Sequence, residues 1–451
     1  MFTKSLYLRI AFLFIASLVL LWVAFYNGFP IVYSDTSTYL SSGFEFETPA
    51  DRPITYGLFI YLTSIGGTTL WLTAFIQCLI IVYVIYLLFK YFSQLKDPAF
   101  YSLVAIVLLA AFSSLPWISG MLLADIFTPV TVFTLLILVF AKDIQKIDNV
   151  LLYVLFFLSN AMHMSHLLIN FLLILSILFF SYLKYFKETF ELVSKKQMLV
   201  LLLITLSGIA IMSSAMSKSK HIFYMGRMVE NGILKKYLDE NCASKNYQIC
   251  VYKDSLPPNA DRFLWDFENS PVYKLGGWKT TKEEFNTIIS ETFTRPEYIA
   301  LHLKAAAGNT LEQLTTFNLG EGNIAFPKGT KLHERIGLFT NDLSRYESAK
   351  QTKGELLLFN KLNNVQLFIV YFSLLLTLIG LFIIDKKRNR SLLLLSVFVL
   401  LGLFFNDMVC ASLSTVANRF AVRVMWMVPL LLLLMIFNRF GATKRNNIYS
   451  T

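Results

Sequence analysis

The sequence predicts an all-α protein that crosses a membrane many times. Apolar residues make up 56% of its 451 residues, and the mean hydropathy is +0.58. Runs of about 20 apolar residues recur towards both ends of the chain, and that length lets a helix cross a hydrocarbon layer of roughly 30 Å. We therefore expect a polytopic helical membrane protein.

About ten transmembrane helices are expected. The apolar runs cover residues 8–27, 69–91, 100–116, 121–141, 150–164, 166–183, 198–214, 366–385, 391–412 and 424–439. The first run is too long for the apolar part of a cleavable signal peptide, and no small-residue cleavage site precedes Ser34. The runs within 150–183 are short around His163 and could instead form a re-entrant pair.

Basic residues in the short loops predict the orientation, because lysine and arginine are enriched on the cytoplasmic side. They are Lys4, Arg9, Lys90, Lys96, Lys142, Lys146, Lys184, Lys187, Lys195, Lys196, Lys386, Lys387, Arg388, Arg390, Lys444 and Arg445. With ten helices and both termini inside, all of them fall on one side. We expect a multi-pass protein of the plasma (inner) membrane with cytoplasmic termini. These residues also explain the net charge of +11, and without a basic stripe on a soluble face, nucleic acid is not an expected partner.

Four segments follow from this topology. Residues 1–214 form an N-terminal transmembrane module of about seven spans, and residues 366–440 form a C-terminal module of about three. Between spans seven and eight, residues 215–365 form a mainly helical extracytoplasmic domain. Residues 441–451 form a cytoplasmic tail.

The extracytoplasmic segment has two further signals. Cys242 and Cys250 are separated by seven residues, and in an oxidising compartment such a pair is expected to close a disulfide, with two free thiols as the alternative. An apolar stripe at helical spacing in 281–317 would suit a helix lying on the membrane or one packed on the rest of the domain.

Polar groups gather at the ends of the apolar runs that this topology places outside. Charged and imidazole groups at a hydrocarbon boundary cost free energy unless they are paired or face water, so their gathering predicts a functional site. The residues concerned are Asp35, Arg52, Asp125, His163, His166, Arg419 and Arg423.

Asp35 lies in a segment rich in serine and threonine after the first span. Its carboxylate could accept a proton from a substrate hydroxyl or hold a cation, but the segment is also a good helix start, where Asp35 would only be a cap. Arg52 follows in the next loop and could pair with a carboxylate or bind a phosphate in a bidentate way.

Asp125 lies at the outer end of the fourth span and should face the bundle interior with a partner. His163 and His166 share a helical face if the helix continues through them. With Asp125 they could hold a divalent metal, or they could bind phosphate, or each could simply bond a carbonyl oxygen.

Arg419 and Arg423 lie at the start of the tenth span. They could extend to the lipid headgroups, or they could bind a lipid-linked phosphate. Asp407 lies late in the ninth span beside Asn406.

These segments together resemble the GT-C superfamily of membrane glycosyltransferases. Ser34-Asp35-Thr36-Ser37-Thr38-Tyr39 resembles the acidic segment of that family's first outer loop, and Arg52-Pro53-Ile54-Thr55-Tyr56-Gly57-Leu58-Phe59 is similar to the basic, proline- and aromatic-containing segment that follows it. Asp125 is in a place comparable to a second acidic position.

The resemblance implies a transferase that moves a sugar from a polyprenyl-phosphate donor to an acceptor hydroxyl at the outer face. Asp35 would be the catalytic base and Asp125 would orient the acceptor or a cation. Substrate or phosphate binding would fall to Arg52, Tyr56, His163, His166, Arg419 and Arg423. A divalent metal is the one cofactor considered, and membrane lipids and the lipid-linked sugar are the expected partners.

Two other classes remain open. A transporter or flippase of a lipid-linked saccharide would place polar groups at mid-membrane; here they gather at the outer rim, and Asp407 keeps this alternative open. Another membrane lipid-modifying transferase would suit the histidine pair with Asp125.

Overall fold

The computed structural model describes residues 2–184, 188–191, 193–385 and 389–446. Its regular elements within this part are all helices, apart from an isolated parallel bridge between Ile31 and Met121. Of the basic residues used to predict the orientation, Lys187, Lys386, Lys387 and Arg388 lie outside the described residues, as do the side chains of Lys4, Lys444 and Arg445 and residues 447–451 of the expected tail.

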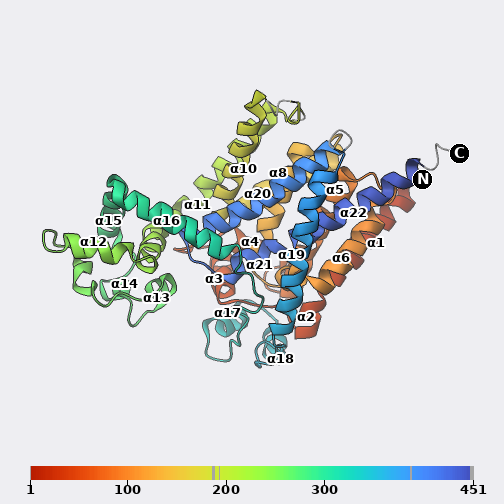
Figure 1. The fold of residues 1–451 in the computed structure, drawn as a ribbon. Coiled ribbons are helices and arrows are strands. Elements are labelled where there is room, and N and C mark those ends of the chain that lie inside the picture. The colour runs from red at the N-terminus through yellow and green to blue at the C-terminus, as the bar shows by residue number, and fades with distance from the viewer. Residues whose placement is uncertain (1, 185–187, 192, 386–388, 447–451) are drawn as a thin grey trace.

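Every predicted apolar run is largely helical and lies in a bundle of helices (Figure 1), but the run 8–27 is interrupted after Leu20 and the run 100–116 after Phe112. The bundle helices are α1 (Phe2–Leu20), α2 (Trp22–Asn27), α5 (Leu70–Phe92), α6 (Pro98–Phe112), α8 (Phe127–Phe140), α9 (Lys146–Asn160), α10 (Met164–Tyr182), α11 (Lys195–Glu230), α19 (Asn360–Ile383), α20 (Arg390–Leu413) and α22 (Met427–Asn446).

The described residues contain six helices that are long and apolar enough to cross a membrane: α5, α10, α11, α19, α20 and the segment Asn418–Arg439. The other runs give shorter apolar helices. Helix α6, for example, has 15 residues and is only about 22 Å long. The chain is therefore a multi-pass helical membrane protein, while the expected number of ten spans is not confirmed.

Short helices and bends make up one end of the bundle. They are α3 (Ser34–Glu45), α4 (Thr55–Thr63), α7 (Leu115–Ser119), the 3-10 turn η1 (Ala124–Ile126) and α21 (Asn418–Met425). Extended backbone between α7 and η1 is paired with the chain after α2: Ile31 N–H donates to Gly120 O at 3.0 Å, and Leu122 N–H donates to Ile31 O at 2.8 Å. Irregular backbone of this kind is tolerated in an apolar region because it is enclosed by protein.

Residues from the loops predicted to be cytoplasmic contact one another at a part of the bundle that does not include the short helices. Lys90 pairs with Asp148 at 2.6 Å, and Gln94 N–H donates to Asn438 at 2.9 Å. Asn438 in turn donates to Asn389 at 2.8 Å. The described residues at these ends of α5, α9, α20 and α22 thus lie close together.

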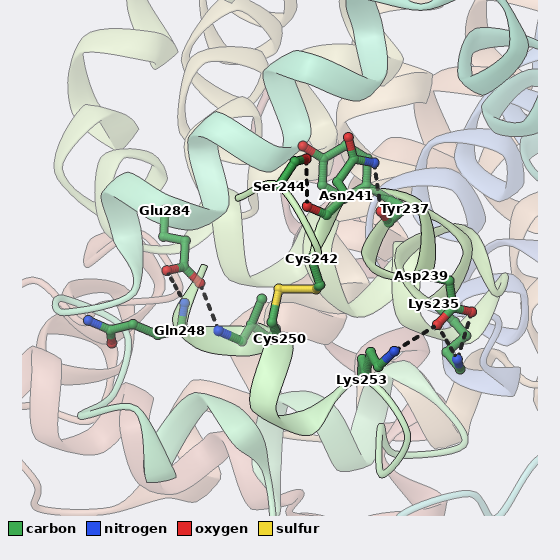
Figure 2. The surroundings of a disulfide bond; sticks show 11 residues. Lys235, Tyr237, Asp239, Asn241, Cys242, Ser244, Gln248, Cys250, Lys253 and Glu284 are labelled. Carbon is green, nitrogen blue, oxygen red and sulfur yellow. Dashed lines mark hydrogen bonds and ion pairs between the residues drawn. A yellow bond between two sulfur atoms is a disulfide. The ribbon is translucent and has the colours of Figure 1, made fainter. Parts of the chain in front are cut away.

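A second hydrophobic core lies beside the bundle, where α12–α16 gather around the end of α11 (Figure 1). Its elements are α12 (Ile233–Asn241), η3 (Gln248–Tyr252), α13 (Ala260–Trp265), α14 (Pro271–Lys274), α15 (Lys282–Thr294) and α16 (Pro296–Gln313). Figure 2 shows the expected disulfide between Cys242 and Cys250, which joins the end of α12 to η3 with a Cα–Cα distance of 5.7 Å.

The segment predicted as one outer domain has two packing environments. Its first part belongs to the second core, but α17 (Lys331–Phe339) and α18 (Leu343–Ser348) contribute Leu332, Ile336 and Tyr346 to the core of the bundle. The predicted boundary at residue 215 falls inside α11, which runs unbroken for 36 residues. A boundary read from hydropathy misses this continuity because a helix can leave an apolar layer without ending.

Two glycines let α3 and α4 cross at very close range. A Cβ on Gly43 would lie 2.1 Å from the carbonyl oxygen of Gly57, and a Cβ on Gly57 would lie 2.7 Å from the backbone nitrogen of Gly43. Only a residue without a side chain fits at either position. This crossing fixes α3, which carries Asp35, against the segment that carries Arg52.

Candidate active site at the end of the bundle

Five of the predicted site residues form a continuous series of ion pairs in which guanidinium and carboxylate groups alternate. We call this series the ion-pair chain. Arg52 lies 3.0 Å from Asp35, Arg419 lies 2.9 Å from the same carboxylate oxygen, and Arg419 also reaches Asp125 at 3.2 Å. Arg423 closes the chain on the other oxygen of Asp125 at 2.8 Å. Residues separated by up to 384 positions in the sequence are thus brought together.

Asp35 lies in the first turn of α3, but its carboxylate is not the helix cap. Thr36 takes that role: its hydroxyl accepts from the Tyr33 N–H at 3.0 Å and donates to Leu122 O at 2.9 Å. The capping alternative for Asp35 therefore does not hold in this structure, and its carboxylate is left to the two arginines.

A general base is expected to have a raised pKa, whereas the pKa of Asp35 is lowered. Burial would raise its pKa, but the charges of Arg52 and Arg419 outweigh that effect and hold the pKa below its usual range. Asp35 is therefore a stable anion while both arginines face it, and it becomes a stronger base only if they are drawn away.

Arg52 is held from several directions. It forms a close ion pair with Asp51, and its guanidinium carbon lies 5.1 Å from the centre of the Tyr39 ring. Burial would lower its pKa, but Asp35 and Asp51 raise it well above the usual value. A guanidinium that keeps its charge at this place can attract an anionic substrate group.

Asp125 is almost completely buried, with 1% of its surface exposed, and both of its oxygens are bonded to arginines. This is the interior, partnered carboxylate that the sequence predicted. Removing water from these charges is costly, and the cost is offset only because each group is paired.

Arg423 has no exposed surface. Besides Asp125, it donates to Asn406 Oδ1 at 2.8 Å and to Ser165 Oγ at 3.2 Å. Its donors are thus occupied by protein groups, so in this structure Arg423 acts on the position of Asp125, while Arg52 and Arg419 remain partly exposed.

The two histidines do not share a continuous helix. His163 has extended backbone and caps α10, with Nδ1 accepting from the Ser165 N–H at 3.2 Å. Because Ser165 also bonds Arg423, His163 is joined to the network, and its Nε2 makes no hydrogen bond to another described residue. The break at residues 161–163 replaces the continuous helix on which their shared face depended.

His166 is buried and both of its ring nitrogens are engaged. Nδ1 lies 2.6 Å from Ser159 O and Nε2 lies 2.8 Å from the Thr128 hydroxyl. Tyr56 is likewise unexposed, and its hydroxyl bonds Gln77. Both residues hold the framework of the site in this structure, and their predicted contact with substrate would require a rearrangement.

A metal centre at His163, His166 and Asp125 is not formed. In the part of the chain that the structure describes, no three histidine, cysteine, aspartate or glutamate side chains come together as metal ligands would. The arginines on Asp125 explain this, because they already neutralise the one carboxylate of the set.

A cover segment, residues 318–323, closes over the site. Glu321 accepts from the Arg419 backbone N–H at 3.0 Å, and the Asn318 N–H donates to Asn418 at 2.7 Å. A recess of about 20 Å³ between this segment and Arg419 is lined by Tyr33 and Asp125, among others. Pockets for drug-sized ligands have several hundred Å³, so a substrate would enter only after the cover segment moves.

Several residues of the network were not predicted as site residues. Ser165 and Asn406 orient Arg423, and Glu321 and Tyr33 contact Arg419. Ser165 lies between His163 and His166, and Asn406 lies beside Asp407. Their positions next to residues selected from the sequence could therefore have indicated both. Glu321 carried no such signal, because only folding brings residue 321 to the bundle.

A comparison of the chain with protein-family models, with curated proteins and with solved structures finds no match in any of the three.

Proposed function

We propose that the chain is a membrane glycosyltransferase that moves a sugar from a polyprenyl-phosphate donor to an acceptor hydroxyl at the extracytoplasmic face. The observation that carries the proposal is Asp35, a partly exposed carboxylate held between two arginines at the end of a membrane bundle. A base beside two cations is what transfer from an anionic leaving group requires. The layout and the segments around Asp35 and Arg52 that resemble the GT-C superfamily support the same reaction.

The proposed step has Asp35 and the arginines acting in turn. The donor phosphate would bind Arg52 and Arg419 and so weaken their pairing with Asp35, which would raise the basicity of that carboxylate. As the acceptor oxygen forms its bond to the anomeric carbon, Asp35 takes the hydroxyl proton. The bond between that carbon and the phosphate oxygen breaks, and the departing polyprenyl phosphate keeps the electron pair beside the two arginines.

The proposed topology places this site outside. Ten crossings with both termini in the cytoplasm put α3, α4 and α21 at the extracytoplasmic end, with the second core as a domain inserted between the seventh and eighth crossings of a plasma membrane. The disulfide in that core supports the assignment, because disulfides persist in oxidising compartments.

The decisive test is sugar transfer by the Asp35→Asn variant. We expect transfer to be lost while the protein is inserted and extracted in normal amounts, because the amide cannot take the proton. Asp254→Asn is the control, since the side chain of Asp254 is 74% exposed and forms no ion pair with a residue of the ion-pair chain. Full transfer by Asp35→Asn would remove this residue from the mechanism.

The donor is identified by native mass spectrometry of the purified protein with its co-extracted lipids. A polyprenyl-phosphate sugar on the parent protein supports the transferase. Bulk phospholipid alone, on both the parent and the variant, would count against it.

A saccharide transporter is the second candidate, because of Asp407. This residue lies late in α20 and is unexposed, and its Oδ2 has no hydrogen-bond partner among the described residues. Movement of a lipid-linked sugar across vesicles by an Asp35→Asn variant that transfers no sugar would favour this reading.

A further inference from the structure

A second recess lies between the bundle and the second core, and it shares no lining residue with the ion-pair chain. It has a volume of about 80 Å³ and lies between α11, α16 and the end of α20. A single water needs roughly 10–15 Å³ of such space, so the recess has room for a small polyatomic group. Its polar lining includes Arg227, Asn231, Asn309, Tyr224 and Ser412.

Arg227 is the most informative of these residues. Only 3% of it is exposed, yet its Nε and both terminal nitrogens have no hydrogen-bond partner among the described residues. Glu230 lies 2.9 Å from one of these nitrogens, but the pair lacks hydrogen-bond alignment. A buried donor without an acceptor costs about 1–3 kcal/mol, and more when it is charged, so a guanidinium left in this state indicates a missing acceptor.

Ser412 gives an independent observation on another helix. Its hydroxyl oxygen is also buried without a hydrogen-bond partner in the described part of the chain. Ser412 belongs to α20, whereas Arg227 belongs to α11, and both line the same recess. Two unsatisfied groups on separate elements point to one ligand that would satisfy both.

The two asparagines of the lining suit an anion, while most of the rest of the lining is apolar. Asn231 and Asn309 add amide groups, which bond each other at 3.2 Å. The negative charge nearest to Arg227 is Glu230, whose Oε2 already accepts from the Ala260 N–H at 2.9 Å. A guanidinium donates two parallel bonds to a phosphate, and a phosphate has further oxygens for a serine hydroxyl and an amide.

The position of Ser412 places the recess near the headgroup layer. Ser412 is the twenty-third residue of α20, and about 20 residues cross the hydrocarbon, so it lies only about 4 Å beyond that layer. Arg227 is the thirty-third residue of α11 and would lie roughly 20 Å beyond the layer on an upright helix, so α11 must be tilted for both residues to line one recess.

We infer that the recess lined by Arg227 and Ser412 is a binding site for a phosphate group, separate from the ion-pair chain around Asp35. The phosphate belongs to a soluble phosphate ester or to a lipid headgroup. The inference does not depend on the proposed transferase activity.

Thermal unfolding of the full chain in detergent, with inorganic phosphate against chloride at equal ionic strength, tests the site. We expect phosphate to raise the unfolding temperature, and the apparent Kd to weaken about tenfold or more in Arg227→Lys and in Ser412→Ala. Lysine keeps the positive charge but cannot form the two parallel hydrogen bonds of a guanidinium. Ser412→Ala provides a second test in case the change at Arg227 impairs folding. Arg262→Lys is the matched control, because Arg262 is an exposed arginine next to the same core.

A second arm distinguishes the two sources of phosphate. Thermal stabilisation of the detergent-solubilised protein by added phosphatidylglycerol that falls in both variants, while added phosphatidylcholine gives no difference, would assign a lipid headgroup. Phosphate stabilisation without that difference would assign a soluble ligand. Loss of the phosphate effect only in Arg419→Lys would place it at the ion-pair chain and overturn the inference, as would an absence of both effects.

Discussion

At the scale of single residues, the two site carboxylates differ in their surroundings. Asp35 has 20% of its side chain exposed, as the proposed exchange of its arginine partners for a substrate requires. Asp125 has 2% of its side chain exposed and binds one arginine with each oxygen. In the proposed mechanism the first carboxylate reacts and the second holds the arginines.

Substitution of Asp125 should therefore cost stability as well as activity. We expect Asp125→Asn to destabilise the protein by about 3–5 kcal/mol, because removing one partner leaves buried charges uncompensated. Asp35→Asn should cost less, since water screens that pair. Thermal unfolding of both variants in detergent checks the order, and equal losses would contradict the difference in burial.

The activity of Asp125→Asn should also fall at least about tenfold, the scale of a lost charged hydrogen bond at a desolvated site. A variant that accumulates normally, unfolds at the parent temperature and transfers sugar at the parent rate would contradict both roles.

At the scale of elements, the crossing of α3 and α4 determines whether Arg52 meets Asp35. We expect Gly43→Ala or Gly57→Ala to destabilise the protein by about 1–3 kcal/mol, because the new methyl group would meet backbone atoms that cannot rotate away. Sugar transfer should fall with it. Gly308→Ala in α16 is the control, since a Cβ there meets nothing within 4 Å.

The disulfide links α12 to η3 within the second core. It closes a loop across a sequence separation of 8, for which the loss of chain entropy amounts to about 2–3 kcal/mol. We expect Cys242→Ser with Cys250→Ser to raise hydrogen exchange in α12 and η3 and to leave the bundle unchanged. A mass shift of the linked peptide on reduction confirms the bond in the parent, whereas free thiols at both positions would refute it.

At the scale of the whole molecule, the topology can be read by cysteine labelling in intact cells. Cysteines placed at Lys142 and at Lys253, both in polar loops, should differ: a membrane-impermeant reagent should reach position 253 and not position 142. The reason is that the proposed ten crossings put these loops on opposite faces. Labelling of both positions from outside would contradict that topology.

The sequence by itself determined the class of protein and the position of its long helices. Each apolar run became helical over most of its length, because backbone groups in a hydrocarbon layer must be satisfied within the segment. It also predicted the disulfide and the chemical character of Asp35, Arg52, Asp125, Arg419 and Arg423, since charged groups at a hydrocarbon boundary must find partners.

Only the tertiary structure determined which charged groups pair with one another. Side chains far apart in the sequence, such as Asp35 and Arg419, meet because helices pack, and no local pattern encodes that meeting. The break at His163, the continuation of α11 beyond its apolar run and the packing of Glu321 over the site are likewise results of packing. Hydropathy records the preference of a segment for lipid, whereas the site depends on which segments touch.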